Sequence, residues 1–272
     1  MSHAPEIFDR TALLHRRKRA RDNDLFLQQI AVDEVQDRLS MVNRSFTSIA
    51  VVTGFPDLWR SVFPKATVVP DTDTLQLKQQ AHDLVVHAMC LHLANDPIGQ
   101  IIQCRRALRP DGLFLGIMLG GQTLHELRSA LAEAEVRVTG GLSPRVAPMG
   151  EIRELGALLQ RSGLALPVAD NVVSTAQYRN LIHLMHDLRG MGETNVLTGR
   201  LRRPTRRAIF DEAETLYKSQ FGTENGHLPA SFEVVCLTGW APADNQPKPL
   251  RPGSAQTRLA DALKTTETNL PD

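Results

Sequence analysis

The chain has 272 residues, of which 42% are hydrophobic and 5% aromatic, and its formal net charge is +1. This length and apolar content are enough for a sizeable core and exclude a chain that is disordered throughout. The near-zero net charge gives no electrostatic reason to expect a nucleic acid partner. Three widely separated cysteines, Cys90, Cys104 and Cys236, fit neither a disulfide framework nor a zinc site and favour a reducing compartment.

The sequence gives no indication of a membrane span or a secretory signal. The longest apolar run, Leu113–Leu119, is too short to cross a bilayer. No charged start leads into an apolar segment, and Glu6 and Asp9 argue against a transit peptide at the N-terminal arginines. We therefore expect a cytoplasmic protein.

Residues 1–46 form a basic lead-in, and one helix is predicted over Asp9–Leu39 because apolar residues recur there at roughly helical intervals. A charge run of this kind is most often a solvated helix face. The alternatives are a surface that meets a protein partner and a peripheral contact with anionic lipid. The basic cluster consists of Arg16, Arg17, Lys18, Arg19 and Arg21.

Strands and helices alternate after residue 47. Ser48–Val52 is an apolar strand, and a short helix follows over Pro56–Phe63. Asp83–Val86 is a second buried strand, Pro97–Leu108 has helical spacing, and a turn then leads into the strand Leu113–Leu119. Strands that alternate with helices predict a parallel sheet in an α/β fold.

The remainder is predicted to be more helical. A strand is expected near Leu164–Val173, and the last strand over Phe232–Leu237. We therefore assign residues 47–241 to one α/β domain with a helical insertion at about 175–230. Residues 242–272 form a Pro-rich tail that we expect to be largely disordered.

Several phrases of the chain resemble a known family. The order DLVV, LH, ND, RRALRPDG and LFLGIMLGG is similar to the second half of a class I S-adenosylmethionine-dependent methyltransferase domain. IFDRTALLHRRKRA, VNRSF, GGLSPRVAPMGEIRELGALLQRSGLALPVAD, LMHDLRGMGETN, LPASFEVVCLTGWAP and KPLRPGSAQTRLADAL extend the likeness over nearly the whole chain. They resemble the alphaproteobacterial branch of methyltransferase-like proteins whose mitochondrial relative is an assembly factor for respiratory complex I.

The resemblance implies a Rossmann-like, mostly parallel sheet with an antiparallel last strand. It also implies S-adenosylmethionine as cofactor and a protein, or a respiratory complex subunit, as partner. Three functions follow as hypotheses. The first is methyl transfer to a protein, the second is hydroxylation of an arginine in a complex I subunit, as associated with the mitochondrial member, and the third is a non-catalytic assembly factor with a degenerate cofactor site.

The cofactor half departs from the family pattern in two ways. The turn after the first strand keeps only Gly54 of the usual glycines, which let the backbone pass close to the cofactor. The chain is also too short here for both the second and third strands of the family. Asp71 therefore matches either the family's adenine-contacting acid or its ribose-binding acid, in which case the third strand is deleted.

The resemblance places the cofactor contacts at Gly54, Asp71, Asp73 and His87. Each has a simpler explanation. Gly54 fits an ordinary strand-to-helix turn, and Asp is common in turns because it bonds the local backbone. His92 matches the family's LHW phrase, although a packed helix histidine is the more common case.

On the substrate side the resemblance points to Glu193, Asn195 and Glu233. A carboxylate in an apolar strand must be paired, so Glu233 is either a structural partner of Arg189 or Arg179 or a group that holds a substrate guanidinium. Catalytic residues cannot be assigned from the sequence. His183 and His186 share a helix face, but no further ligands are suggested and no metal site is predicted.

Overall fold

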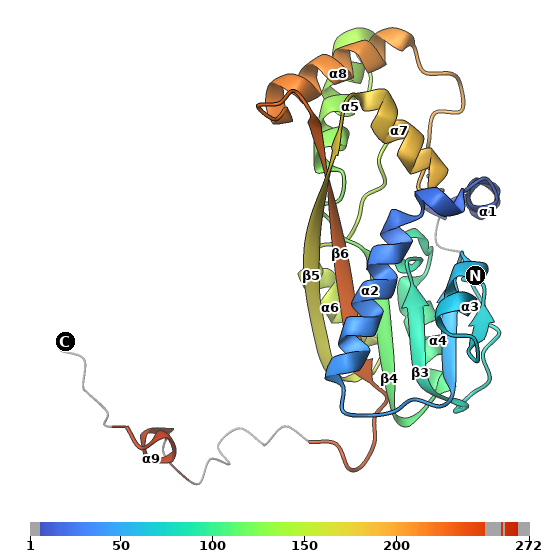
Figure 1. Cartoon of the computed structure of the whole chain (residues 1–272), viewed down its shortest axis with the longest axis vertical. Helices are drawn as coiled ribbons and strands as arrows, with labels where there is room; N and C mark the ends of the chain where they lie inside the picture. Colours follow the sequence, from blue (N-terminus) through green and yellow to red (C-terminus); the bar gives the residue numbers. More distant parts are fainter. Residues whose placement is uncertain (1–5, 248–256, 258, 266–272) are drawn as a thin grey trace. The chain divides into compact units, whose positions relative to one another are not determined.

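Strands and helices alternate from β1 to β6 in the computed structural model, and Figure 1 shows the sheet with helices on both faces. The structure describes residues 6–247, 257 and 259–265. The chain divides into two units, Met1–Pro242 and Ala243–Asp272. The tail that we predicted at 242–272 lies largely outside the described residues, apart from its start and the short helix α9 (Leu259–Leu263).

The first unit holds the remaining elements. The strands are β1 (Ile49–Thr53), β2 (Thr67–Val69), β3 (His82–Ala88), β4 (Leu108–Leu119), β5 (Ala165–Tyr178) and β6 (Leu228–Trp240). The helices are α1 (Arg10–Arg17), η1 (Asp22–Asp24), α2 (Phe26–Met41), α3 (Pro56–Val62), η2 (Leu91–Leu93), α4 (Pro97–Ala107), α5 (His125–Thr139), α6 (Ile152–Arg161), α7 (Leu181–Gly190) and α8 (Arg207–Phe221). None of the described helices is both long and apolar enough to cross a membrane.

The described strands form one sheet in the order β2-β1-β3-β4-β6-β5. β2, β1, β3 and β4 pair in parallel, with Val51 opposite Val86 in the centre. β6 pairs antiparallel with both β4 and β5, so it alone among the described strands runs against the rest. The mostly parallel sheet with an antiparallel last strand is confirmed.

The β2 edge of the described sheet has one strand fewer than the resemblance implies. β2 pairs directly with β1, and within the described residues no strand pairs with its outer side. Asp71 therefore follows the strand next to β1, which agrees with the alignment that deletes the third strand.

Alternate residues of each strand face two different helical layers. Val51 and Val86 pack in a cluster with α2, α3 and α5, whereas Ala50 and Val85 pack in a second cluster with α4 and α6. Trp59 of α3 is fully buried in the first layer, where its indole donates a hydrogen bond to α2. The two layers leave the edge formed by the strand ends as the place for a site.

The N-terminal prediction of one helix over Asp9–Leu39 is wrong. α1 ends at Arg17 and α2 begins at Phe26. The intervening Lys18–Leu25 stretch is almost entirely polar, and its Asp22-Asn23-Asp24 run favours local side-chain bonds to the backbone over a continuous helix. The break lets α1 cross the sheet edge instead of continuing along α2.

β5 and β6 form a ribbon that extends beyond the rest of the sheet. β6 pairs with β4 only from Val234 to Trp240, whereas it pairs with β5 as far as Leu228. The protruding end of the ribbon meets the helices α5, α7 and α8 (Figure 1). α7 and α8 are the helical insertion that the sequence predicted before the last strand.

Candidate cofactor cleft and acceptor cavity

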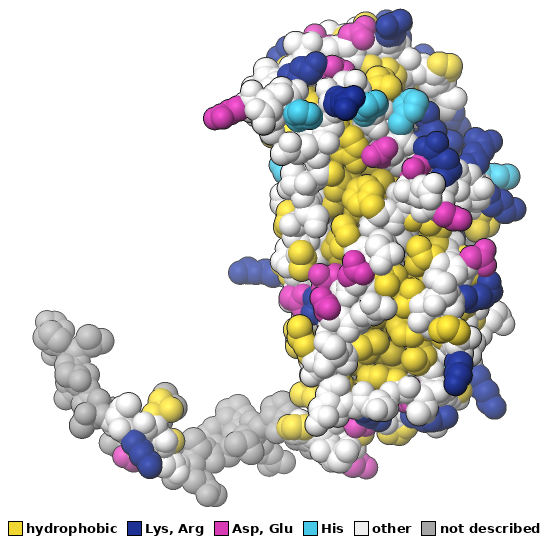
Figure 2. All heavy atoms as spheres, in the orientation of Figure 1, with side chains coloured by type: hydrophobic (Ala, Val, Ile, Leu, Met, Phe, Trp, Pro, Cys, Tyr) yellow, Lys and Arg dark blue, Asp and Glu magenta, His cyan; other side chains and the backbone are white. Residues whose placement is uncertain are grey.

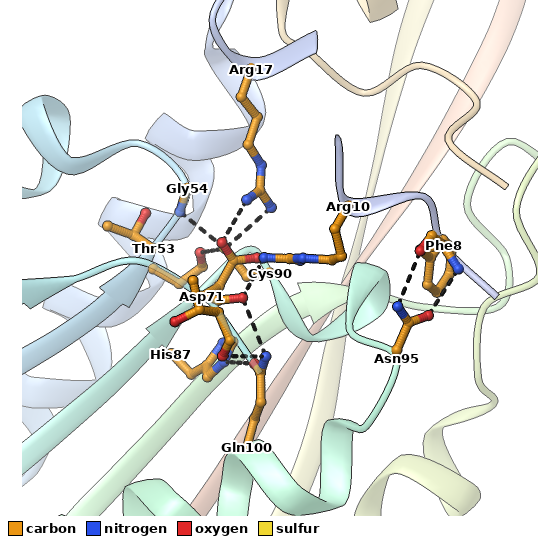
Figure 3. Close-up of polar contacts among 12 residues, drawn as sticks. Phe8, Arg10, Arg17, Thr53, Gly54, Asp71, His87, Cys90, Asn95 and Gln100 are labelled. Carbon is orange, nitrogen blue, oxygen red and sulfur yellow. Dashed lines mark hydrogen bonds and ion pairs between the residues drawn. The ribbon is translucent and has the colours of Figure 1, made fainter. Parts of the chain in front are cut away.

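Three polar groups meet at the carboxyl ends of β1, β2 and β3. Gly54 follows β1, Asp71 lies two residues after β2, and Cys90 lies two residues after β3. The Gly54 N–H donates to the Cys90 Sγ over 3.2 Å, and the Cys90 thiol donates to the Ala88 carbonyl over 3.1 Å. Figure 3 shows these groups gathered around one point of the sheet edge.

Arg17 of α1 fills this point. Its guanidinium lies 2.7 Å from Asp71 Oδ1 and 3.5 Å from Cys90 Sγ. A Cβ atom added to Gly54 would lie 2.4 Å from the guanidinium carbon, so only glycine leaves room for this arginine. Arg10, two helical turns earlier, lies 3.2 Å from Asp71 Oδ2. Both oxygens of the Asp71 carboxylate therefore have a cationic partner.

The N-terminal segment is held against the sheet, which fixes α1 over the cleft. The Asn95 side chain accepts from the amides of Ile7 and Phe8 and donates to the Phe8 carbonyl (Figure 3). The Asp9 carboxylate caps α1 by accepting from the Ala12 amide. Arg17 is thus directed inward by the anchored helix, and its side chain is only 5% exposed.

The Asp71 carboxylate in the cleft is paired with two cations. Burial by itself would raise the pKa of the Asp71 carboxyl, but Arg17 and Arg10 outweigh burial and lower the pKa. Burial raises the pKa of the Cys90 thiol, so this side chain stays protonated. The cleft therefore holds one carboxylate, two guanidinium groups and a neutral thiol.

His87 lies behind the cleft rather than in it. Its side chain is fully buried, and Nε2 lies 2.7 Å from Gln100 Oε1. Gln100 Nε2 in turn donates to the Asp71 carbonyl over 3.4 Å. Burial lowers the pKa of His87 to about 4, so the ring is neutral at pH 7.

A cavity of about 540 Å³ opens beside Arg17 and is lined by Gly54 and Asp71 together with Leu14, Phe55 and Val69, among others. Of the predicted cofactor residues, Gly54 and Asp71 come together here. Asp73 is exposed, and neither it nor His87 lines this cavity. Those two assignments stay predictions.

These residues fit S-adenosylmethionine. An acid after the strand next to β1, a glycine turn after β1 and apolar walls are the groups that a nucleoside cofactor needs at this sheet edge. The cavity volume is within the range of about 300–1,000 Å³ that small-molecule sites usually have. In this conformation, however, the Arg17 guanidinium pairs with the Asp71 carboxylate. A ribose can therefore reach this carboxylate only when Arg17 moves.

A second cavity, of about 710 Å³, lies beyond the carboxyl end of β4. It is enclosed by β4, α5, α7 and the segment 193–205, and its lining includes the predicted substrate residues Glu193 and Asn195. Asn195 is engaged in local bonds, since it donates to the Pro144 carbonyl and accepts from the Leu197 amide.

Glu193 pairs with His92. The Leu119 amide donates to His92 Nδ1 over 3.4 Å, which leaves the proton of the neutral ring on Nε2. Nε2 lies 3.5 Å from the Glu193 carboxylate. Glu193 also acts electrostatically on Arg17 and Cys90, so its charge is felt in the cleft.

Glu233 is buried, is hydrogen-bonded within the protein and does not line the larger cavity. Its carboxylate accepts hydrogen bonds from the Asn171 side chain and, over 2.8 Å, from the Gln122 amide. Neither Arg189 nor Arg179 is its partner, so the predicted ion pair does not form. Hydrogen bonds to polar neutral groups satisfy the buried carboxylate instead.

His183 and His186 are exposed on α7. Among the residues that the structure describes, no three His, Cys, Asp or Glu side chains gather closely enough to hold a metal ion.

Arg17, Arg10 and Cys90 are the site residues that the sequence analysis missed. Arg17 was counted with the solvated basic cluster. The signal was its position on α1, seven residues after Arg10 and therefore on the same helix face, next to the apolar Leu13 and Leu14.

Comparison with known proteins agrees with this fold. Residues 30–116 match the family described as "Methyltransferase domain", which covers α2 to β4. Topology and this match together define a methyltransferase-like α/β protein. The chain is 36% identical over 234 residues to the protein named arginine-hydroxylase NDUFAF5, mitochondrial, of Danio rerio, an alignment that covers 85% of this chain and 70% of that protein. The chain belongs to the family of that protein.

Relatives of the same name in four other organisms are 35–37% identical, and the chain spans only 44–60% of their length. A protein named malonyl-[acyl-carrier protein] O-methyltransferase, of Xylella fastidiosa, is 32% identical over 66% of this chain and 58% of its own. Among solved structures, the YcgJ protein of Bacillus subtilis matches 79% of this chain and 99% of its own with a TM-score of 0.48 and 12% identity. That likeness is too low to carry an argument.

Proposed function

We propose that this protein is an S-adenosylmethionine-dependent enzyme that transfers a methyl group to a protein, with the cofactor in the 540 Å³ cavity. The observation that carries the proposal is that Gly54 and Asp71, which follow neighbouring parallel strands, line that one cavity. The methyltransferase domain match over residues 30–116 supports it, because this part of the chain supplies both residues.

Each residue has a defined task in this proposal. The bound cofactor supplies a methyl group on a positively charged sulfur. Asp71, once released by Arg17, accepts hydrogen bonds from ribose hydroxyls, and Gly54 allows close approach of the ligand to the backbone. Leu14 and Val69 form an apolar wall of the same cavity.

The acceptor group reaches the cleft from the side of Glu193. This carboxylate lines the larger cavity, and its charge acts on Arg17 and Cys90 in the cleft. His92 Nε2 lies 3.5 Å from this carboxylate without a hydrogen bond to it. Methyl transfer depends mainly on in-line positioning, and a positioned carboxylate can orient an N–H or O–H acceptor for it.

Calorimetric titration with S-adenosylmethionine and S-adenosylhomocysteine tests the proposal. We expect micromolar binding, about −8 kcal/mol. The variant Asp71→Asn should weaken binding at least tenfold, because it removes a charge-assisted acceptor worth about 1.5–3 kcal/mol. Asp33→Asn is the matched control, since Asp33 is exposed on α2 and does not line this cavity, and it should bind as the unmodified chain does.

Gly54→Val provides a second probe, because its side chain enters the space next to Arg17. We expect it to abolish binding and also to lower the melting temperature, because the valine displaces the Arg17 guanidinium from its pair with Asp71. Equal effects of Asp71→Asn and Asp33→Asn, or unchanged affinity in Gly54→Val, would show that the cofactor does not bind here.

Arginine hydroxylation is the second candidate, because the mitochondrial relatives at 35–37% identity carry that name. A respiratory complex subunit is then the substrate, and the reaction needs an oxidant from outside the chain. Mass spectrometry of subunits incubated with the protein separates the candidates, since hydroxylation adds an oxygen atom and methylation adds a methylene unit.

A non-catalytic assembly factor is the third candidate, and Arg17 in the cleft favours it. Absence of heat and of a thermal shift with both cofactor forms would support it over the two enzymes. In each case we propose that the protein works in the cytoplasm. The exposed Lys18, Arg19 and Arg21 would then contact the membrane surface near a respiratory complex.

A further inference from the structure

The larger cavity has an apolar interior. Its lining includes Leu119 at the end of β4, Leu127 of α5, Phe232 of β6 and Met185 and Leu188 of α7. These side chains come from both the sheet and the helical insertion, so the apolar surface is continuous across the two. Burying the methylene groups of an aliphatic ligand against these side chains would stabilise its binding.

Arginines dominate the charged part of the same lining. Arg145 and Arg200 are neutralised, because Arg145 pairs with Glu135 and Arg200 pairs with Asp9. Arg16, Arg189 and Arg203 also line the cavity, and within the part of the chain that the structure describes their guanidinium groups have no ion-pair partner. Figure 2 shows Lys and Arg side chains gathered on the side of the molecule that carries α1 and α7.

Only one acidic residue, Glu193, is found among the described residues that line this cavity, and it already faces His92. The cavity therefore has an excess of positive charge that nothing in its lining compensates. The hydroxyl of Thr194 adds a second unused group, since its Oγ1 is buried without a hydrogen-bond partner and lines the same space. A buried hydroxyl without a partner is a place for a ligand atom.

We propose that the larger cavity binds an acyl chain that carries an anionic group, a carboxylate or a phosphate. The acyl chain of the ligand packs on the apolar residues. Its anionic group is held by Arg16, Arg189 and Arg203 through charge-assisted hydrogen bonds. The volume, about 710 Å³, suits a ligand of this size. This binding does not depend on methyl transfer, because it involves the arginines and not the Asp71 cleft.

Calorimetric titration of the full chain without cofactor tests this inference. The probes are dodecanoate and dodecyl phosphate, below their micellar concentrations, with dodecyltrimethylammonium and dodecyl maltoside as cationic and neutral probes of the same chain length. We expect both anions to bind more tightly than the other two, and their affinity to fall as salt rises. A dodecanoyl thioester of phosphopantetheine distinguishes an acyl group carried on a protein from a free acyl anion.

The double variant Arg189→Gln, Arg203→Gln should weaken anion binding about tenfold, a loss of about 1.4 kcal/mol. Both residues are exposed, so the fold is retained. The matched control is Arg153→Gln, Arg161→Gln, which removes two exposed arginines from α6. Equal binding of the cationic probe, or equal weakening by the control variant, would overturn the inference.

The two proposals fail separately. Loss of anion binding with intact S-adenosylmethionine binding would overturn only the acyl ligand. The reverse result would overturn only the cofactor cleft.

Discussion

Arginine has opposite roles at the two ends of the same sheet edge. In the cleft, Arg17 and Arg10 share the buried Asp71, and every charge has a partner. In the larger cavity, Arg16, Arg189 and Arg203 have no ion-pair partner among the residues that the structure describes. A compensated buried charge holds structure together, whereas an uncompensated one at a cavity is available for a ligand.

The largest effect should come from removing the acid that compensates the cleft. Asp71→Ala leaves Arg17 buried without its anion, and we expect a loss of about 3–5 kcal/mol in the free energy of unfolding. For a unit of this size that lowers the melting temperature by roughly 6–20 °C. Asp73→Ala, at an exposed position, should change stability by less than about 0.5 kcal/mol. Similar melting temperatures for both variants would show that Arg17 is not held by Asp71.

The next prediction concerns the pH dependence of stability. It tests whether the His87 ring behind the cleft is buried away from water. The folded pKa of His87 is about 4, whereas an unfolded histidine has about 6.5. Between these values the unfolded chain binds more protons, so stability falls as pH is lowered. We expect a loss of about 2 kcal/mol between pH 7 and pH 5 from this group. Urea unfolding should show that the variant His87→Gln loses this part of the pH dependence, and an unchanged slope would contradict a buried neutral ring.

A smaller effect should follow from opening the cleft. Arg17→Met keeps the apolar stem of the side chain but frees one oxygen of Asp71, while Arg10 still pairs with the other. If Arg17 competes with the cofactor, affinity for S-adenosylhomocysteine should rise several-fold, a gain of about 1 kcal/mol. Weaker binding in calorimetry would instead make Arg17 a ligand of the cofactor.

The smallest effect is expected at the larger cavity. Arg189→Gln, Arg203→Gln removes charges that have no partner in the described structure, so the free energy of unfolding should change by less than about 0.5 kcal/mol. Chemical denaturation of this variant beside Asp71→Ala compares the two regions directly. A loss as large as that of Asp71→Ala would mean that these arginines are structural.

Much of the fold could be predicted from the sequence because its signals are local. The strands at Ser48–Val52 and Leu113–Leu119 are apolar runs between turns, and both are strands in the structure. The lack of a strand beyond β2 could also be predicted, because the chain between β1 and β3 is too short for two strands. The break between α1 and α2 was missed because helical spacing of apolar residues before and after Lys18–Leu25 suggested one continuous helix.

The site was less predictable because its contacts are long-range. The partner of Asp71 is 54 residues away in the sequence, and the partners of Glu233 are 62 and 111 residues away. A carboxylate in an apolar strand shows that a partner is needed, but not whether the partner is an arginine or an amide. The structure shows that the partners of Glu233 are the Asn171 side chain and the Gln122 amide.

The position of β6 has a consequence for synthesis of the chain. β6 is the last strand in sequence but lies between β4 and β5, so β5 has no described partner in the sheet until β6 is made. The intervening residues 179–227 take roughly 2–10 s to translate at about 5–20 residues per second. During that interval β5 presents Val168, Val172 and Val173, which stay exposed even after folding, next to an unpaired backbone. Slow elongation through the helical insertion should therefore favour aggregation of the nascent chain, and a chaperone that covers β5 should reduce it.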